Sequence, residues 1–299
     1  MNAKRKALVL GGDSGLLGQS VSKVLEDAGW EVSRLGRRQI DFTERDASRR
    51  LEAFVDSLEP ELLVNSAAYT KVDAAEEETE LAGLLNRALP ATLGRIVKTR
   101  PCVLVHYSTD FVFNGKKRVP YSTDDAPDPL NVYGKSKLAG EEALLSLELE
   151  KCLIIRTAWL FGPGRGNFIL TILDRARKNR TVNVVYDQIG SPTYTPDLAA
   201  HTLKLVEAEE YGIFHVVNSG QASWCDLADE AVRLSQIECR VKPVSSNEYS
   251  QRARRPAYSA LDCTRFYRVT GIKPRPWPQA LRDYVYTHLA SLMPSENGG

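Results

Sequence analysis

The sequence predicts an α/β protein in which a doubly wound parallel sheet is followed by a smaller C-terminal α/β lobe. In the first half of the 299-residue chain, short apolar runs alternate with stretches of helical periodicity, and this alternation is typical of a parallel sheet. The elements of the second half are shorter and are separated by Pro, Ser and Gly. We therefore expect one domain over residues 1–160, to which some later segments return, and a lobe formed mainly by residues 161–299.

Each expected strand of the first half is a short apolar run, as a strand buried on both faces requires. These strands cover residues 7–10, 30–33, 62–64, 103–107 and 153–155. Helical periodicity predicts helices from residue 16 up to Gly29 and over 44–58, 79–98 and 131–147. In the second half, helices are expected at 168–177, 197–208, 224–236 and 278–292, with a strand at 214–217.

Composition excludes several classes of protein. The net charge is +1 and the sequence pI is about 7.6, so no overall field attracts nucleic acid or a membrane surface. We see no run of about 18 apolar residues that would span a bilayer. The five cysteines and four histidines lack the spacing of a disulfide framework or a metal site. We expect a cytoplasmic protein without a metal requirement, and His106 is expected to be a buried strand residue.

A glycine-rich turn follows the first expected strand. Gly12, Gly15 and Gly18 form G-x-x-G-x-x-G at the point where a helix begins. Such a turn lets a phosphate approach the backbone, and the helix N-terminus presents free N–H groups to it. The motif therefore predicts a Rossmann-type dinucleotide site, whose contacts in this turn would be Gly12, Ser14, Gly15, Leu16, Leu17 and Gly18.

The end of the second strand indicates which dinucleotide binds. An acidic residue there favours NAD, whereas an arginine accommodates the 2′-phosphate of NADP. Arg37 and Arg38 lie about 20 residues after Gly18, while Asp41 and Phe42 follow as further cofactor contacts. We expect NADPH as the cofactor, with NADH also usable.

Tyr133 and Lys137 are four residues apart and so share one face of a helix. A nearby ammonium stabilises a phenolate and is expected to lower the pKa of Tyr133 toward neutrality. Thr109 and Asp110 end the fourth strand, at the sheet edge where doubly wound proteins carry their sites. A Thr109 hydroxyl there would hydrogen-bond a substrate carbonyl.

These features together resemble the short-chain dehydrogenase/reductase superfamily, in which the glycine motif, a Ser or Thr, and Y-x-x-x-K occur in this order. The length and the C-terminal lobe resemble its extended branch, which acts mostly on nucleotide sugars.

Longer strings resemble the dTDP-4-dehydrorhamnose reductases more narrowly. They are NSAAYTKVDAAE at 65–76, STDFVFNG at 108–115, RTAWLFG at 156–162, GNF at 166–168, DQIGSPT at 187–193 and RPAYSALD at 255–262. The resemblance implies reduction of the 4-keto group of dTDP-4-dehydro-L-rhamnose, with Thr109, Tyr133 and Lys137 as the catalytic set. It also implies cofactor contacts at Ala67, Ala68 and Tyr69, and substrate contacts at Thr109, Asp110, Trp159, Asn167 and Arg255.

Some positions depart from the family pattern. Phe111 and Asn114 stand where Tyr and Asp are frequent. Some members dimerise through magnesium held by glutamates, and one such position is Ser20 here, which argues against that metal site while leaving a homodimer open.

Two alternatives remain at this point. The first is another nucleotide-sugar 4-ketoreductase, an epimerase or a dehydratase of the same superfamily, although Phe111 occupies the place of the second acid that dehydratases carry. The second is a non-catalytic regulatory subunit of the same fold. The intact Thr109, Tyr133 and Lys137 favour an enzyme.

Overall fold

The computed structural model of the chain describes residues 4–164, 166–249 and 251–289. Its centre is a six-stranded sheet with the order β10-β5-β4-β3-β1-β2, in which every neighbouring pair is parallel. The strands are β1 (Lys6–Leu10), β2 (Glu31–Leu35), β3 (Leu62–Asn65), β4 (Val103–Thr109), β5 (Cys152–Thr157) and β10 (Gly212–His215). The predicted fold class is confirmed, and the strand expected at 214–217 is β10, which pairs with β5 in this sheet.

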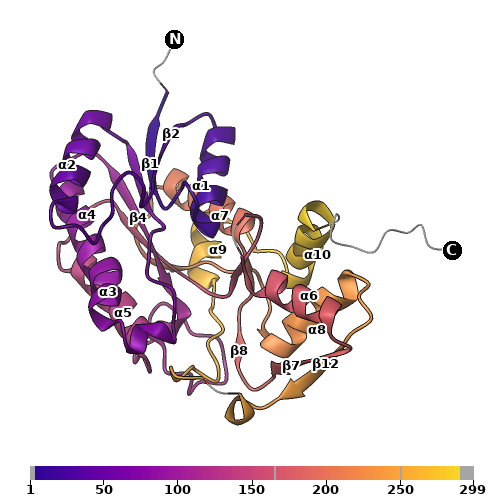
Figure 1. Cartoon of the computed structure of the whole chain (residues 1–299). Helices are drawn as coiled ribbons and strands as arrows, with labels where there is room; N and C mark the ends of the chain where they lie inside the picture. Colours follow the sequence, from indigo (N-terminus) through magenta and orange to yellow (C-terminus); the bar gives the residue numbers. More distant parts are fainter. Residues whose placement is uncertain (1–3, 165, 250, 290–299) are drawn as a thin grey trace.

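Helices cover both faces of the sheet (Figure 1). On one face pack α1 (Leu16–Asp27), α7 (Thr195–Glu207) and α9 (Thr264–Thr270). On the other pack α2 (Ala47–Leu58), α4 (Leu89–Val97) and α5 (Val132–Leu145). Successive strand residues point to opposite faces, so the apolar runs of the sequence supply both cores at once.

The single helix expected at 79–98 is three consecutive segments. α3 (Thr79–Gly83) passes into a π-helical turn, η2 (Leu84–Ala88), and then into α4. The wider turn contains Asn86, whose side chain is fully buried. π-Helical turns of this kind are frequent at functional sites.

The C-terminal lobe has its own apolar core. It is built from α6 (Phe168–Lys178), α8 (Trp224–Leu234), α10 (Trp277–His288) and the parallel pair β7 (Thr181–Val185) and β12 (Arg240–Val244). Two further short pairs are β6 (Leu160–Phe161) with β9 (Thr193–Tyr194), which is parallel, and β8 (Ile189–Gly190) with β11 (Ala222–Ser223), which is antiparallel. The short helical turns are η1 (Ala74–Glu76), η3 (Asp110–Val112) and η4 (Ser246–Glu248). Residues 290–292 of the predicted last helix lie outside the described residues.

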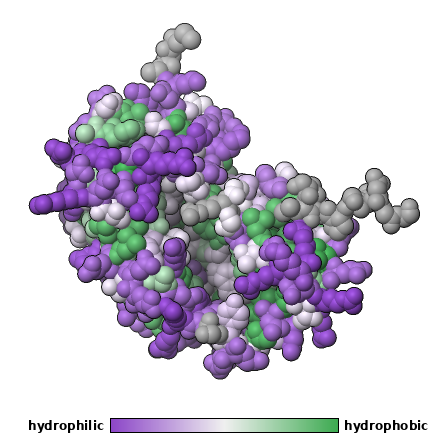
Figure 2. Space-filling view, in the orientation of Figure 1, coloured by the Kyte–Doolittle hydropathy of each residue, from purple (hydrophilic) through white to green (hydrophobic). Residues whose placement is uncertain are grey.

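The surface is hollowed between the sheet domain and the lobe, as Figure 2 shows. Residues from late in the chain return to the sheet domain here, because Leu261 forms a bridge with Tyr121. The domain division at residue 160 stays a prediction. Within the described part of the chain, every helix is too short or too polar to cross a bilayer.

Candidate active site

The predicted site residues follow the carboxyl ends of neighbouring strands. In sheet order, Arg37 and Arg38 follow β2, the glycine turn follows β1, Ala67 follows β3, Thr109 ends β4 and Trp159 follows β5. Ligands of open α/β sheets bind at this edge, where the strand order reverses. The arrangement gives one continuous row, from the arginines at one side to the indole at the other.

The backbone of the glycine turn is packed too tightly for side chains. Gly11 has a φ of +77°, a conformation that glycine adopts readily. A Cβ on Gly15 or Gly18 would stand 2.5 or 2.3 Å from the carbonyl oxygen of Gly11. Gly15 is also the N-cap of α1, so no side chain of its own covers the first N–H groups. This turn is suited to an anion such as a pyrophosphate.

Arg37 and Arg38 differ in what surrounds them. The Nε of Arg37 donates to Oδ2 of Asp41 at 2.8 Å, whereas Arg38 is exposed and makes no hydrogen bond or ion pair within the described residues. Hydrogen bonds from Thr43 and Arg37 lower the pKa of Asp41 to about 2. Phe42 is half-buried against the core under α2. Of the two arginines, Arg38 is therefore the one available to a phosphate.

Asn86 is a residue that the sequence did not reveal. Its Oδ1 accepts from the backbone N–H of Tyr69 at 2.9 Å, and its Nδ2 donates to the carbonyl of Tyr69 at 3.0 Å and to Ser136 Oγ at 2.9 Å. Asn86 thereby ties the segment after β3, with Ala67 and Ala68, to α5. No periodicity marks such a residue, because its partners lie 17 and 50 positions away in the chain.

Thr109, Tyr133 and Lys137 come together between the end of β4 and the first turns of α5. Thr109 lies near enough to Tyr133 to lower the pKa of the phenol, and the ring of Tyr133 meets Phe111 edge-on, with ring centroids 5.9 Å apart. Lys137 is 2% exposed, and its Nζ donates to the carbonyl of Tyr107 at 2.6 Å. Asn131 caps the helix by accepting from the N–H of Gly134 at 2.7 Å.

The pKa of Tyr133 differs from the prediction. Burial raises it to about 12, against the lowering effect of the Thr109 hydrogen bond, so the expected shift toward neutrality is not found. Burial also lowers the pKa of Lys137 to about 8, although Glu141 opposes this shift. At neutral pH the phenol is therefore protonated and the ammonium is largely charged.

Asp110 lies between two hydroxyl groups. Its Oδ1 accepts from Thr109 at 3.1 Å, and its Oδ2 accepts from Ser259 at 2.5 Å. Burial nevertheless raises the pKa of the carboxyl to about 7. Since Ser259 lies 149 residues later in the chain, this contact joins the returning segment to the catalytic strand.

Trp159 has an unusual backbone and a close aromatic neighbour. Its φ is +48°, which is rare for a bulky residue. The indole stacks on Trp224 with ring centroids 3.6 Å apart. A Cβ on Gly190 would stand 2.5 Å from the indole, so Gly190 leaves the room that the ring occupies.

Two predicted substrate contacts already have protein partners. Asn167 caps α6 by accepting from Leu170, and its Nδ2 donates to the carbonyl of Gly162 and to the hydroxyl of Tyr284. Arg255 forms a two-pronged ion pair with Asp73, at 3.0 and 2.7 Å. The structure gives both residues a structural role, and their roles in substrate binding stay predictions.

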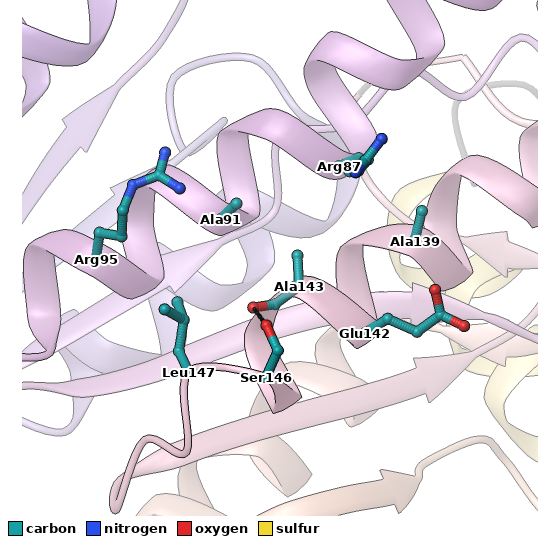
Figure 3. Close-up of a pocket in the computed structure, with 8 residues that line it drawn as sticks. All are labelled: Arg87, Ala91, Arg95, Ala139, Glu142, Ala143, Ser146 and Leu147. Atoms are coloured by element: carbon teal, nitrogen blue, oxygen red, sulfur yellow. Dashed lines mark hydrogen bonds between the residues drawn. The ribbon is translucent and has the colours of Figure 1, made fainter.

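A separate open groove of about 590 Å³ lies between the helices of η2–α4 and α5 (Figure 3). None of the predicted site residues lines it; the lining residues are Arg87, Ala91, Arg95, Ala139, Glu142, Ala143, Ser146 and Leu147.

Comparisons with known proteins identify the family of the chain. The family model described as RmlD substrate binding domain matches residues 5–289. The chain belongs to this family. The spore coat polysaccharide biosynthesis protein SpsK of Bacillus subtilis is 41% identical to this RmlD family member, over 94% of this chain and 96% of that protein. A dTDP-4-dehydrorhamnose reductase of Aggregatibacter actinomycetemcomitans is 37% identical, over 92% of this chain and 97% of that protein.

Among solved structures, the dTDP-4-dehydrorhamnose reductase of Bacillus anthracis in complex with NADP is similar to this RmlD family member. The two structures match with a TM-score of 0.90 and 31% sequence identity, and the match covers 95% of this chain and 100% of that chain. The family resemblance indicated by the sequence strings is confirmed.

Proposed function

We propose that this protein reduces the 4-keto group of dTDP-4-dehydro-L-rhamnose with NADPH, giving dTDP-L-rhamnose. The observation that carries the proposal is that Thr109, Tyr133 and the buried Lys137 gather at the strand edge that also carries the glycine turn. Relatives that carry the reductase name and a similar structure with NADP support it.

The row of strand ends fits a dinucleotide. The N-terminus of α1 would hold the pyrophosphate, Arg38 the 2′-phosphate, and the segment of Ala67, Ala68 and Tyr69 the nicotinamide half. The fit rests on the glycine turn, in which a Cβ would meet the Gly11 carbonyl, and on the exposed guanidinium of Arg38, which has no ion-pair partner among the described residues. When bound, NADPH supplies the hydride that reduces a carbonyl carbon.

The protein's own groups bind the oxygen of that carbonyl and supply its proton. Tyr133 would donate a hydrogen bond to it, and Thr109 would do so once its hydroxyl turns away from Asp110; donors aimed at an oxygen that gains negative charge lower the barrier. A phenol with a pKa of about 12 is protonated at neutral pH, as a proton donor must be. The Lys137 ammonium adds positive charge behind it, and Trp159 with Trp224 forms an aromatic wall toward the lobe.

The proposal is tested by mixing the protein with NADPH and dTDP-4-dehydro-L-rhamnose. We expect stoichiometric oxidation of NADPH, and NMR of the product should show the C4 configuration of L-rhamnose. Tyr133→Phe should lower kcat by about 10²–10⁴-fold, the usual contribution of a positioned general acid, while leaving NADPH binding nearly intact. Tyr186→Phe, at a 53% exposed tyrosine, is the matched control. Wild-type turnover in Tyr133→Phe would refute the assigned donor.

Cofactor choice is measured in the same assay. Arg38→Ala should lower kcat/KM for NADPH by about tenfold or more, since a hydrogen bond to a charged group contributes about 1.5–3 kcal/mol. The kcat/KM for NADH should change little. Arg37→Ala should have the smaller effect, because its guanidinium is paired with Asp41. A clear NADH preference of the wild type would contradict the NADPH assignment.

A further inference from the structure

A buried histidine lies directly behind the site lysine. His106 on β4 is the register partner of Asn65 on β3, and directly opposite residues of neighbouring strands point to the same face of a sheet. Lys137 of α5 reaches the same place from its helix. Asn65 and His106 are each 1% exposed and Lys137 is 2% exposed, so their polar atoms need hydrogen-bond partners within the protein.

The contacts form a chain. The Nδ2 of Asn65 lies 3.0 Å from Nδ1 of His106, and Nε2 of His106 lies 3.4 Å from Nζ of Lys137. Burial, with the charge of Lys137, holds the pKa of His106 well below its ordinary value. The ring is therefore neutral, and one of its nitrogens donates while the other accepts.

The direction of the hydrogen bonds from Asn65 through His106 to Lys137 follows from the positive charge of Lys137. With the Asn65 amide turned so that Nδ2 faces the ring, Nδ1 must accept, Nε2 carries the hydrogen, and two donors oppose each other at Lys137. The opposite amide orientation, which has nearly the same outline, pairs Oδ1 with an Nδ1–H and leaves the Nε2 lone pair facing the ammonium.

We propose that Asn65 and His106 are positioning residues for Lys137, with Asn65 Oδ1 accepting from His106 Nδ1–H and His106 Nε2 accepting from the Lys137 ammonium. Together with the Tyr107 carbonyl, this arrangement uses two of the three ammonium hydrogens. The third is left for a group in the site. Only this last step rests on the proposed function.

A neutral acceptor suits this place. Lysine has a flexible stem and a charge that burial disfavours. The titratable groups that act on its ammonium are His106 on β4 and Glu141 on α5 itself, while Tyr133 lies one helical turn before Lys137. Glu141 is already occupied, because it accepts from Arg156 and from Ser108. His106 therefore fixes the position of the ammonium without neutralising it.

The first test is read on the wild-type protein without cofactor, and a variant serves only to assign the signals. In protein labelled with ¹⁵N-histidine, the ring shifts of His106 report which nitrogen carries the hydrogen, and His106→Gln assigns the resonances. We expect hydrogen on Nδ1 and none on Nε2 throughout the pH range in which the protein is folded. Hydrogen on Nε2, or a ring that becomes doubly protonated near neutral pH, would overturn the proposal.

The second test follows Lys137 itself. Its pKa is read from ¹³C and ¹⁵N shifts in protein labelled with lysine, and Lys137→Met assigns the signal. His106→Leu should lower this pKa by about one to two units, the equivalent of one hydrogen bond to a charged group. His106→Gln, which restores an acceptor oxygen, should return it toward the wild-type value. Equal values in wild type and a folded His106→Leu variant would contradict the proposal.

Kinetics separate this inference from the proposed function. If dTDP-4-dehydro-L-rhamnose is turned over, kcat of His106→Leu should fall and its pH profile should shift with the pKa of Lys137, and His106→Gln should recover both. A merely structural role would lower the amount of folded protein without moving the pH profile. If the sugar is not turned over, the proposed function fails, while the two NMR tests still decide the roles of Asn65 and His106.

Discussion

At the scale of single residues, Asp110 shows how burial sets the properties of the site. Its carboxyl accepts from Thr109 and Ser259, yet desolvation outweighs both hydrogen bonds and raises its pKa to about 7. In the unfolded chain the same group has a pKa near 3.8. Between these two values the folded protein binds a proton that the unfolded chain has released.

This difference predicts a pH dependence of stability. Because the folded state binds more protons, the contribution of Asp110 is fully present below pH 3.8 and is lost as the pH rises through about 7. Asp110→Asn cannot ionise, so between pH 5 and 8 its free energy of unfolding should rise relative to wild type by roughly 2–3 kcal/mol. Urea unfolding at both pH values measures this change. Exposed Asp124→Asn is the control, and parallel pH profiles of wild type and Asp110→Asn would contradict the prediction.

At the scale of elements, the start of α1 depends on glycines for two different reasons. Gly11 supplies a left-handed backbone, whereas Gly15 and Gly18 allow the Gly11 carbonyl to approach the helix. Backbone atoms cannot move aside as a flexible side chain can. The turn therefore tolerates little change in volume, although each substitution would look conservative in sequence.

Gly18→Ala should destabilise the protein by about 1–3 kcal/mol, the usual effect of overpacking, and should weaken NADPH binding because the turn must shift. Gly83→Ala is the matched control. Gly83 lies in α3 with no neighbouring atom within 4 Å of its Cβ position among the described residues. Gly83→Ala should therefore raise the free energy of unfolding by about 0.5–1 kcal/mol. For each variant, denaturant unfolding measures the stability and a fluorescence titration measures the affinity for NADPH. Equal stabilities of the two variants would show that the close approach of Gly11 is unimportant.

The elements also show what sequence can and cannot predict. Apolar runs and the glycine motif predict the strands of the central sheet and the cofactor turn, because these signals are local. Asn86 and its π-helical turn escape prediction, since the turn is stabilised by partners on Tyr69 and Ser136. The pKa of Tyr133 is mispredicted because spacing along a helix reports a neighbouring charge but not the depth of burial.

At the scale of the whole molecule, one late segment is bonded to the sheet domain. Asp73, after β3, accepts from both terminal nitrogens of Arg255 and from the backbone N–H groups of Arg252 and Ala253. Its pKa is lowered, chiefly by Arg255. This contribution to stability is present above the unfolded pKa near 3.8 and is lost as the pH falls through the lower folded value.

Asp73→Ala should therefore release the segment from the sheet domain. A carboxylate that accepts four hydrogen bonds contributes about 1–3 kcal/mol, and the lower end applies because its side chain is 44% exposed. We expect trypsin to cut after Arg252 and Arg254 about tenfold faster, since cleavage follows the population of the open form. Glu77→Ala removes only the exposed ion pair with Arg252 and should leave the rate nearly unchanged. Equal cleavage rates in the two variants would mean that the segment is held by its apolar contacts and its Ser259–Asp110 bond rather than by Asp73.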